Sequence, residues 1–191
     1  MNLELIKCKR TDSVYQEIRN RHYIPNKGTH GQQMHYKISL DNNIVGIISG
    51  ASSVWAVKAR DEFFGLNKDN KRKGLPSIIN NTVFRLEVHI PNLATRVLAM
   101  WRKTCAKDWL ERYNVIPHGF ETFVIETNYR KGTLYKADNW IYLGQTAGST
   151  KAHPKGMAQK SERVVTVPKL IFAKKIPKTT LSTEYESSWN K

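Results

Sequence analysis

The segment GTLYKADNWIYLG, residues 132–144, follows the apolar run FETFVI at residues 120–125 after a short polar loop. The apolar run has the length and composition of a buried strand. Beyond the loop, Thr133–Asp138 predicts a short helix that carries Tyr135, and Ile141–Leu143 predicts a further strand. A strand, a helix and a second strand in this order indicate a small α/β domain.

The preceding chain alternates between strands and helices. Leu3–Lys9 alternates apolar and polar residues as a half-buried strand does, and Thr11 and Asp12 are both candidate N-caps for a helix to about Arg21. Asn92 is a candidate N-cap for the longest helix, which keeps its apolar spacing to about Tyr113. Three more strands are expected at Tyr36–Leu40, Ile44–Ala51 and Val83–Ile90. We therefore expect an α/β (α+β) fold, a mixed sheet flanked by helices.

Two parts of the chain depart from this alternation. Residues 52–78 have mixed periodicity, and their loop at residues 67–74 carries four basic residues against one acid, Asp69. After Gly144 the composition becomes basic, and two short strands are expected at Val164–Val167 and Leu170–Ala173. We therefore divide the chain into a catalytic core at 1–146, a basic C-terminal β extension packed on or beside it at 147–179, and a frayed tail at 180–191.

The charge of the chain is its most unusual bulk property. Lys and Arg number 31 against 16 Asp and Glu, which gives a formal net charge of +15 and an isoelectric point near 9.9. Such a field attracts polyanions and speeds their association. Nucleic acid is the polyanion that we expect, with a solvated basic surface as the alternative. An apolar content of 40% indicates a globular and not a disordered chain.

Cysteine usage and hydropathy indicate where the protein works. Cys8 and Cys105 are too few and too far apart for a metal knuckle or a disulfide framework, and Cys105 fits a small buried hydrophobe of the longest helix. The first residues contain no apolar stretch of signal length, and no run approaches 18 apolar residues. We therefore expect no membrane partner and a cytoplasmic location.

Several side chains are candidates for chemistry. Tyr135 can protonate a leaving group or hold a reacting group, and a locally bonded core tyrosine is the alternative. His22, before the loop at 24–31, can be a general base, one metal ligand or a favourable charge at a helix end. Arg85 alternates with Glu87 on one strand face, which fits either a cleft or an internal ion pair. Glu126 follows the expected strand at residues 120–125, at the carboxyl end where open α/β sheets bind ligands.

Basic side chains around the short helix and after it are candidates for binding nucleic acid. Such residues neutralise phosphates without reading sequence. Tyr129, Trp140 and Tyr142 can stack on an extruded base, with core packing as the alternative for Trp140. The candidate phosphate-binding residues are Arg130, Lys131, Lys151, Lys155, Lys160 and Arg163.

The order of the expected elements resembles the GNAT acyltransferase fold, apart from the irregular insertion between the third and fourth strands. The resemblance implies that the helix tyrosine protonates the leaving group. It also implies that backbone N–H groups of Asn92, Leu93 and Ala94, at the start of the longest helix, bind the cofactor pyrophosphate. The chain has no glycine there and Pro91 lacks an N–H, which argues against coenzyme A.

Short motifs across residues 20–150 resemble two further families. The motifs are His22-Tyr23, Lys58–Glu62, Pro91–Ala94, Asp108–Tyr113, Glu121–Val124 and Gly132–Thr146. They resemble the A-subunit family of the Druantia anti-phage system, and the same core is similar to the phage Mom proteins. The Mom resemblance implies a GNAT-like fold and conversion of the exocyclic amine of adenine in DNA to a carbamoylmethylated form, which protects the DNA from restriction.

On this sequence the Mom resemblance implies catalytic roles for His22, Tyr23, Arg85 and Tyr135. It also implies an acid at the end of the fifth strand. Ile125 holds the direct position, and Glu126 takes the role only if one residue is inserted. Iron held by the His-Tyr pair is implied by the family alone, and this departure counts against it.

We therefore expect a DNA-modifying transferase that adds a small acyl or carbamoylmethyl-type group to the exocyclic amine of adenine. Its partner is double-stranded DNA with the target adenine flipped out of the duplex. It needs a small-group donor, whose identity the sequence does not specify. The alternatives are a DNA-binding component of an anti-phage assembly that performs no chemistry, and a coenzyme A-dependent acetyltransferase.

Overall fold

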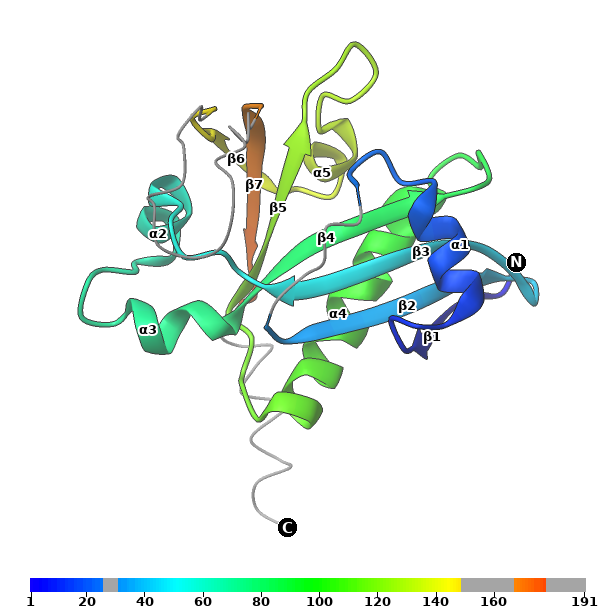
Figure 1. The fold of residues 1–191 in the computed structure, drawn as a ribbon, viewed down its shortest axis with the longest axis horizontal. Coiled ribbons are helices and arrows are strands. Elements are labelled where there is room, and N and C mark those ends of the chain that lie inside the picture. Colours follow the sequence, from blue (N-terminus) through cyan, green and yellow to red (C-terminus); the bar gives the residue numbers. More distant parts are fainter. Residues whose placement is uncertain (26–30, 149–166, 178–191) are drawn as a thin grey trace, which may run out of the picture.

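The computed structural model describes residues 1–25, 31–148 and 167–177 of the 191-residue chain. Its strands form one sheet in the order β1-β2-β3-β4-β5-β7-β6 (Figure 1). Neighbouring strands are antiparallel except for the parallel pair β4 and β5. The strands are β1 (Leu3–Cys8), β2 (Gln33–Leu40), β3 (Asn43–Ser52), β4 (Ile78–Leu86), β5 (Gly119–Ile125), β6 (Ile141–Gln145) and β7 (Lys169–Lys175). The expected α/β class with a mixed sheet is confirmed.

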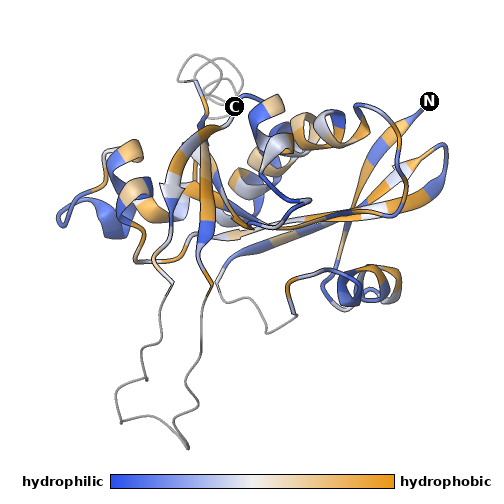
Figure 2. Ribbon diagram, turned by 90° about the horizontal axis from the view of Figure 1, so that it is seen from above, coloured by the Kyte–Doolittle hydropathy of each residue, from blue (hydrophilic) through white to orange (hydrophobic). Residues whose placement is uncertain are grey.

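Helices cover both faces of the sheet. They are α1 (Ser13–Asn20), α2 (Lys58–Phe64), α3 (Lys71–Gly74), the 3-10 turn η1 (Leu75–Ser77), α4 (Leu93–Tyr113) and α5 (Thr133–Ala137). Figures 1 and 2 show α1 on one face and α4 on the opposite face, while α2 and α3 lie near the β6–β7 end. Of the two expected N-caps, Thr11 and Asp12, the Asp12 side chain caps α1, because it accepts a hydrogen bond from Tyr15 N–H at 3.0 Å.

The main core lies between α4 and the sheet. Trp101, Cys105 and Trp109 of α4 are fully buried, which confirms Cys105 as a core residue. Gly50 of β3 allows this close approach of α4, since a Cβ there would lie only 3.1 Å from Cys105 Sγ and 3.2 Å from the Trp101 ring. A smaller cluster between α1 and the other face contains Tyr15, Ile18, Ile47 and Val83.

The strands β4 and β5 pair over only part of their lengths. Their pairing begins at Ile78↔Gly119 and ends at Asn81↔Thr122, after which the two strands diverge (Figure 1). A β-bulge lies at this point, because the register of β4 against β3 shifts between Ser49 and Gly50. Bulges bend a strand and increase its twist, so this one turns β4 away from β5. We call the region beyond Asn81↔Thr122 the β4–β5 fork.

Two boundaries expected from the sequence are wrong. The fourth strand covers Ile78–Leu86 and not Val83–Ile90. The predicted strand starts too late because Asn80 and Asn81 belong to the strand, and asparagine is rare in strands. Residues 52–78, expected to be irregular, form α2, α3 and η1 and begin β4.

The basic extension expected after residue 146 takes part in the sheet. Leu170–Ala173, expected to be a strand, lies within β7, which is inserted between β5 and β6. The other expected strand, Val164–Val167, falls outside the described residues except for Val167. No helix in the described part of the chain is long and apolar enough to span a lipid bilayer.

Candidate active site

Tyr135 of α5 lies at the point where β4 and β5 part. Its hydroxyl donates to Asn81 Oδ1 at 2.8 Å. The Thr122 hydroxyl donates to the Asn81 carbonyl oxygen at 3.0 Å and lies 3.4 Å from the phenol oxygen. Asn81 and Thr122 are the last paired residues of β4 and β5, so the phenol closes the base of the fork.

Aromatic packing fixes the Tyr135 ring. Phe172 of β7 stacks on it at 5.8 Å between ring centroids, and Trp140 meets it edge-on at 5.2 Å. Gly132 precedes α5 with a φ of +69°, and a Cβ there would overlap the Phe172 ring, so this position requires glycine. Burial raises the pKa of Tyr135, although the Thr122 hydrogen bond opposes the shift. The phenol therefore stays protonated at neutral pH.

His22 and Tyr23 follow α1, and their rings lie 4.6 Å apart. The Arg19 side chain holds this segment by donating to the Ile24 carbonyl at 2.7 Å. Burial, together with the positive charges of Arg19, Arg85 and Arg130, lowers the pKa of His22 to about 4. His22 is therefore neutral at pH 7.

The hydrogen bonds of His22 determine which ring nitrogen carries the proton. The Ile24 N–H donates to His22 Nδ1 at 3.2 Å. A neutral imidazole has one N–H, so an Nδ1 that accepts leaves the proton on Nε2. In this arrangement Nε2 is a hydrogen-bond donor, and neither nitrogen has a free lone pair for a substrate proton or a metal. The arrangement suits an orienting donor better than the base or metal ligand expected from the sequence.

Tyr23 connects the end of α1 to the fork. A backbone hydrogen bond from Ile125, the last residue of β5, reaches its phenol oxygen, and the Arg130 guanidinium lies 4.0 Å from its ring centroid. Burial raises the pKa of Tyr23, while Arg130 opposes the shift. Tyr23 is 37% exposed and Tyr135 only 8%, so Tyr23 is the phenol with more access to a substrate.

Arg85 makes internal contacts that leave its guanidinium partly exposed. It donates to the Arg21 carbonyl at 2.6 Å and forms an ion pair with Glu87. Glu87 also pairs with Arg21 Nε at 3.1 Å. The internal ion pair expected as one alternative is therefore present, and it ties β4 to the segment that carries His22.

Glu126 is exposed at the end of β5. Its carboxylate accepts a 3.4 Å hydrogen bond from Gln145 of β6. The described residues contain no group of three or more His, Cys, Asp or Glu side chains arranged to hold a metal ion. The side chains around His22 therefore do not fit the iron site that the Mom resemblance implies.

The start of α4 does not fit a glycine-loop pyrophosphate site. Asn92 precedes the helix as expected, but it has left-handed backbone angles (φ 60°, ψ 0°) and its side chain makes no capping hydrogen bond. The Leu93 side chain is fully buried and its N–H already donates to the Ile90 carbonyl at 3.2 Å. With Pro91 also lacking an N–H, the expected donors are reduced to the N–H groups of Asn92 and Ala94.

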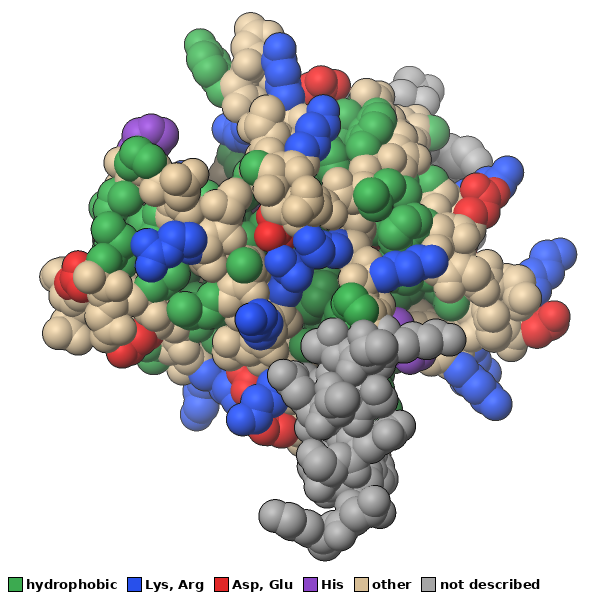
Figure 3. Space-filling model, turned by 180° about the vertical axis from the view of Figure 1, so that it is seen from behind, with side chains coloured by type: hydrophobic (Ala, Val, Ile, Leu, Met, Phe, Trp, Pro, Cys, Tyr) green, Lys and Arg blue, Asp and Glu red, His purple; other side chains and the backbone are tan. Residues whose placement is uncertain are grey.

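Two of the six expected phosphate-binding residues lie in the part of the chain that the structure describes. Arg130 and Lys131 are exposed beside the fork. Figure 3 shows Lys and Arg side chains spread over the face that carries α4, with acidic side chains between them. Trp140 is buried, so the alternative of core packing is the correct one, whereas Tyr129 is 95% exposed. The expected contacts Lys151, Lys155, Lys160 and Arg163 lie outside the described residues.

Sequence reasoning missed several polar residues that build the fork. Asn81 and Thr122 hold the Tyr135 hydroxyl, and on the opposite face of the same strands Arg60 Nη1 lies 2.8 Å from Glu121 Oε2 with both side chains fully buried. The signal for these residues is the polar pair Asn80-Asn81 inside an apolar run. Buried polar groups need partners, so a pair of this kind marks a place where other polar side chains converge.

Solved structures with a similar arrangement of elements are acetyltransferases. A Bacillus subtilis acetyltransferase in complex with CoA has 6% identity and a TM-score of 0.60, over 92% of this chain and 100% of that chain. Arabidopsis thaliana NAA60 in complex with acetyl-CoA has 12% identity and a TM-score of 0.57, over 92% and 98%. A GNAT family acetyltransferase from Elizabethkingia anophelis with acetyl-CoA bound has 8% identity and a TM-score of 0.53, over 92% and 99%. At these identities the likeness shows the fold alone, and it confirms the expected GNAT-like fold.

Comparisons at the level of sequence give a family. Curated protein sequences show no significant match to the chain. A family model described as Druantia protein DruA matches residues 1–165, which is most of the chain. This match agrees with the resemblance carried by the motifs of residues 20–150. The chain belongs to the Druantia protein DruA family.

Proposed function

We propose that this protein is a transferase that adds a small acyl or carbamoylmethyl-type group to the exocyclic amine of adenine in DNA, and so protects the DNA from restriction. One observation carries the proposal. At the fork of a GNAT-like sheet, two protonated phenols and a neutral histidine lie among three arginines. The resemblance to Mom proteins supplies the adenine, and the cytoplasm of a bacterial cell is the expected location.

The exocyclic amine of adenine is the nucleophile of this reaction. It is a weak nucleophile, because its lone pair is delocalised into the ring. The amine nitrogen forms a bond to the electrophilic carbon of the donor, and the bond between that carbon and its leaving group breaks. The nitrogen loses one of its two protons and the leaving group gains one. Orientation and exclusion of water are therefore the main contributions that the protein can make.

The phenols suit the leaving-group side of this reaction. Raised pKa values keep Tyr23 and Tyr135 protonated, so both can donate a hydrogen bond to the developing negative charge. Tyr23 has more access, and we assign it the first contact with the leaving group. Tyr135 reaches a substrate only if its hydroxyl turns away from Asn81 Oδ1.

The remaining fork residues suit binding and late proton removal. His22, with its proton on Nε2, can donate a hydrogen bond to a ring nitrogen of the base. The exposed parts of Arg85 and Arg130 can hold an anionic donor or a DNA phosphate. Glu126, the exposed carboxylate next to Ile125, is the assigned acceptor of the amine proton. No step is routed through coenzyme A or iron, because the residues at α4 and around His22 do not fit them.

Double-stranded DNA fits the charge of the protein. A net charge of +15 favours a polyanion over a small neutral amine. Adenine inside a duplex cannot reach the fork, so the base has to be flipped at a cost of a few kcal/mol.

A DNA-binding component that performs no chemistry is the second candidate, and one observation favours it. The Tyr135 hydroxyl is bonded to Asn81, and the side chain is buried as a structural tyrosine would be. An ordinary coenzyme A-dependent acetyltransferase is disfavoured by the start of α4. Thermal shift with coenzyme A tests that alternative, which predicts stabilisation on binding.

Mass spectrometry of nucleosides tests the proposal. DNA from cells that express the protein is digested and compared with DNA from cells that express Tyr23→Phe or Tyr135→Phe. A new adenosine adduct that is lost in either variant is expected, and its mass identifies the transferred group. Tyr142→Phe, which removes an exposed phenol on β6, is the matched control and should keep the adduct. An unmodified profile for the wild-type protein would leave the DNA-binding candidate.

A further inference from the structure

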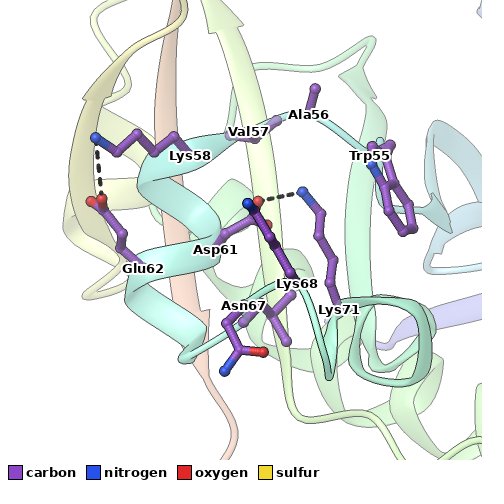
Figure 4. Close-up of a pocket in the computed structure, with 10 residues that line it drawn as sticks. Trp55, Ala56, Val57, Lys58, Asp61, Glu62, Asn67, Lys68 and Lys71 are labelled. Atoms are coloured by element: carbon purple, nitrogen blue, oxygen red, sulfur yellow. Dashed lines mark hydrogen bonds and ion pairs between the residues drawn. The ribbon is translucent and has the colours of Figure 1, made fainter.

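A groove separate from the fork lies in the insertion between β3 and β4 (Figure 4). Its volume is about 630 Å³, and Val57 and Leu66 form part of its apolar lining. Trp55 stands on one side, across from α2 (Figure 4). Residues 58–62, one of the motifs that resemble the Druantia family, form the α2 side of the groove. We call it the Trp55 groove.

Trp55 is unlike the other described tryptophans. Its side chain is 59% exposed, whereas Trp101, Trp109 and Trp140 are buried. Val54 beside it is also exposed, so an apolar surface faces solvent at the mouth of the groove. An open indole ring offers a flat π-face, on which planar groups such as nucleic-acid bases stack.

Two lysine side chains, Lys68 and Lys71, line the groove together with this indole. Lys71 Nζ lies 5.0 Å from the ring centroid and 2.5 Å from Asp61 Oδ2, so the ammonium group is held in place. Lys68 is exposed and has no ion-pair partner within the described residues. Figure 4 shows Lys68 and Lys71 extending toward α2 from the same segment. The Lys71 ammonium lies over one face of the indole ring, so a base can stack on the other face with its phosphate near the two lysines.

The groove is joined firmly to the fork. Arg60 of α2 donates to the Val54 carbonyl at 2.6 Å, directly before Trp55. The same guanidinium forms the buried 2.8 Å ion pair with Glu121 of β5. Arg60 Nε also contacts Asp61 at 2.7 Å, and Asp61 holds Lys71. One buried side chain therefore fixes the Trp55 groove relative to the strand that leads to the fork.

From these contacts we propose that the Trp55 groove binds one unpaired nucleotide of the DNA strand. The base stacks on Trp55, and its phosphates contact Lys68 and Lys71. This inference rests on the proposed function, since it states how the enzyme holds the strand from which adenine is flipped. It assigns single-stranded or locally opened DNA, and not intact duplex, to this groove.

Fluorescence anisotropy with a labelled single-stranded oligonucleotide and the full chain tests the stacking. Trp55→Ala should weaken binding about tenfold, in line with the usual contribution of one base–aromatic stack. Trp55→Phe should keep most of the affinity, because it keeps a π-face. Ile6→Ala is the matched control, since Ile6 on β1 is 40% exposed and lies outside the groove. Thermal unfolding of each variant confirms that it is folded.

The lysine contribution has a separate readout. Lys68→Ala should reduce the slope of log Kd against log salt by about 1, as expected for one lost phosphate contact. Lys103→Ala, which removes an exposed lysine on α4, should leave the slope unchanged. Photo-crosslinking with an iodouracil-containing oligonucleotide should label the peptide that contains Trp55.

The outcomes separate this inference from the proposed function. Wild-type binding that Trp55→Ala leaves unchanged, or that Ile6→Ala weakens instead, overturns the groove assignment alone. Competition by an acidic peptide as strong as that by the oligonucleotide also overturns it, because the groove would then recognise protein. If the wild-type chain binds no DNA and makes no adduct, the proposed function fails together with it.

Discussion

The two faces of the β4–β5 pair hold different buried polar groups at nearly the same level of the sheet. On the face toward α5, Asn81 and Thr122 form a neutral cluster with the Tyr135 hydroxyl. The Asn81 side-chain amide also donates to the Ser49 and Val83 carbonyls at 3.0 and 3.2 Å. Both polar ends of the Asn81 side chain are therefore satisfied, as buried groups require.

One residue earlier on each strand, the opposite face is charged and only partly satisfied. Glu121 pairs with Arg60, but its Oε1 atom and the neighbouring Asn80 Oδ1 have no hydrogen-bond partner in the described part of the chain. The Ser53 hydroxyl lies near this carboxylate but donates to the Ile78 carbonyl at 2.8 Å. Burial raises the pKa of Glu121, and the positive charge of Arg60 opposes that shift.

One strand pair therefore serves two tasks. The neutral cluster positions a phenol at the fork without any charge to desolvate. The ion pair attaches the insertion that carries α2 and Trp55, and a buried ion pair depends strongly on both partners. We therefore expect the two faces to respond very differently to substitution.

The largest effect is expected on the charged face. Arg60→Ala leaves the Glu121 carboxylate buried without its partner and should lower the free energy of unfolding by about 3–5 kcal/mol. Urea denaturation measures the change. The double variant Arg60→Met with Glu121→Leu should recover much of the loss, since it removes both charges and keeps volume. A double variant as unstable as Arg60→Ala would show that the charge left behind is not the cause.

The next effect concerns pH and two histidines on the side of α1, of which His22 is buried and His35 half-buried. Burial lowers the pKa of His22 and of His35 to about 4, against 6.5 for an exposed histidine. Each of these histidines therefore binds a proton below pH 6.5 in the unfolded chain, but only below about pH 4 in the folded chain. The free energy of unfolding should fall as pH decreases through this window, by at most about 1.4 kcal/mol per pH unit for each histidine.

Variants identify the source of this pH dependence. Replacement of both His22 and His35 by Asn should flatten the curve of unfolding free energy between pH 6.5 and 4. His35 Nδ1 lies 3.0 Å from Ser49 Oγ and 3.1 Å from the Tyr15 hydroxyl, so an asparagine amide keeps a polar group there. A double variant with the wild-type slope would assign the effect to other groups.

Substitution of the adjacent residues Asn80 and Asn81 tests directly whether the two faces of the β4–β5 pair differ. Asn81→Leu removes the acceptor of Tyr135 and the donor to two carbonyls, and should cost about 1–3 kcal/mol of stability. Asn80→Leu replaces a side chain whose oxygen has no partner among the described residues, so it should be neutral or stabilising. Equal losses for the two variants, measured by thermal unfolding, would remove the distinction between the faces.

The smallest effect is expected at the exposed edge of the fork. Arg130→Ala removes a cation–π contact with Tyr23 and should change stability by only about 0.5–1 kcal/mol. The same substitution should reduce DNA binding more clearly, because the guanidinium is exposed beside the fork. Arg130→Lys, which keeps the charge, should retain most of the binding at low salt. A large loss of stability would instead place Arg130 within the structural framework.

The sequence predicted the fold better than the site, for reasons that particular residues show. Apolar periodicity located α4 and β5, and the order of elements suggested the GNAT-like sheet. The bulge opposite Ser49 and Gly50 could not be predicted, because a bulge does not change the apolar periodicity of the sequence. The start of β4 was not predicted because it contains two asparagines. The strand order also could not be inferred, because nothing local in β7 indicates that it inserts between β5 and β6.

For the site, the motif residues were named but their contacts were not. His22, Tyr23 and Tyr135 do converge on the fork, which the resemblance implied and the spacing could not show. Asn81 was missed because its role comes from a hydrogen bond to a residue far along the chain. Glu126 remains a prediction, since its carboxylate contacts only Gln145 among the described residues.

The position of β7 has a consequence for how the protein is made. Within the described sheet, β6 has β7 as its strand neighbour, and Phe172 of β7 stacks on Tyr135. The ribosome releases α5 and β6 before β7, so a nascent chain exposes the open edge of β5 until residue 175 has emerged. Uncovered strand edges are sites of misassembly and of chaperone contact. Completion of the fork is therefore a late event in synthesis, and until then the chain lacks the stacking that fixes its Tyr135 ring.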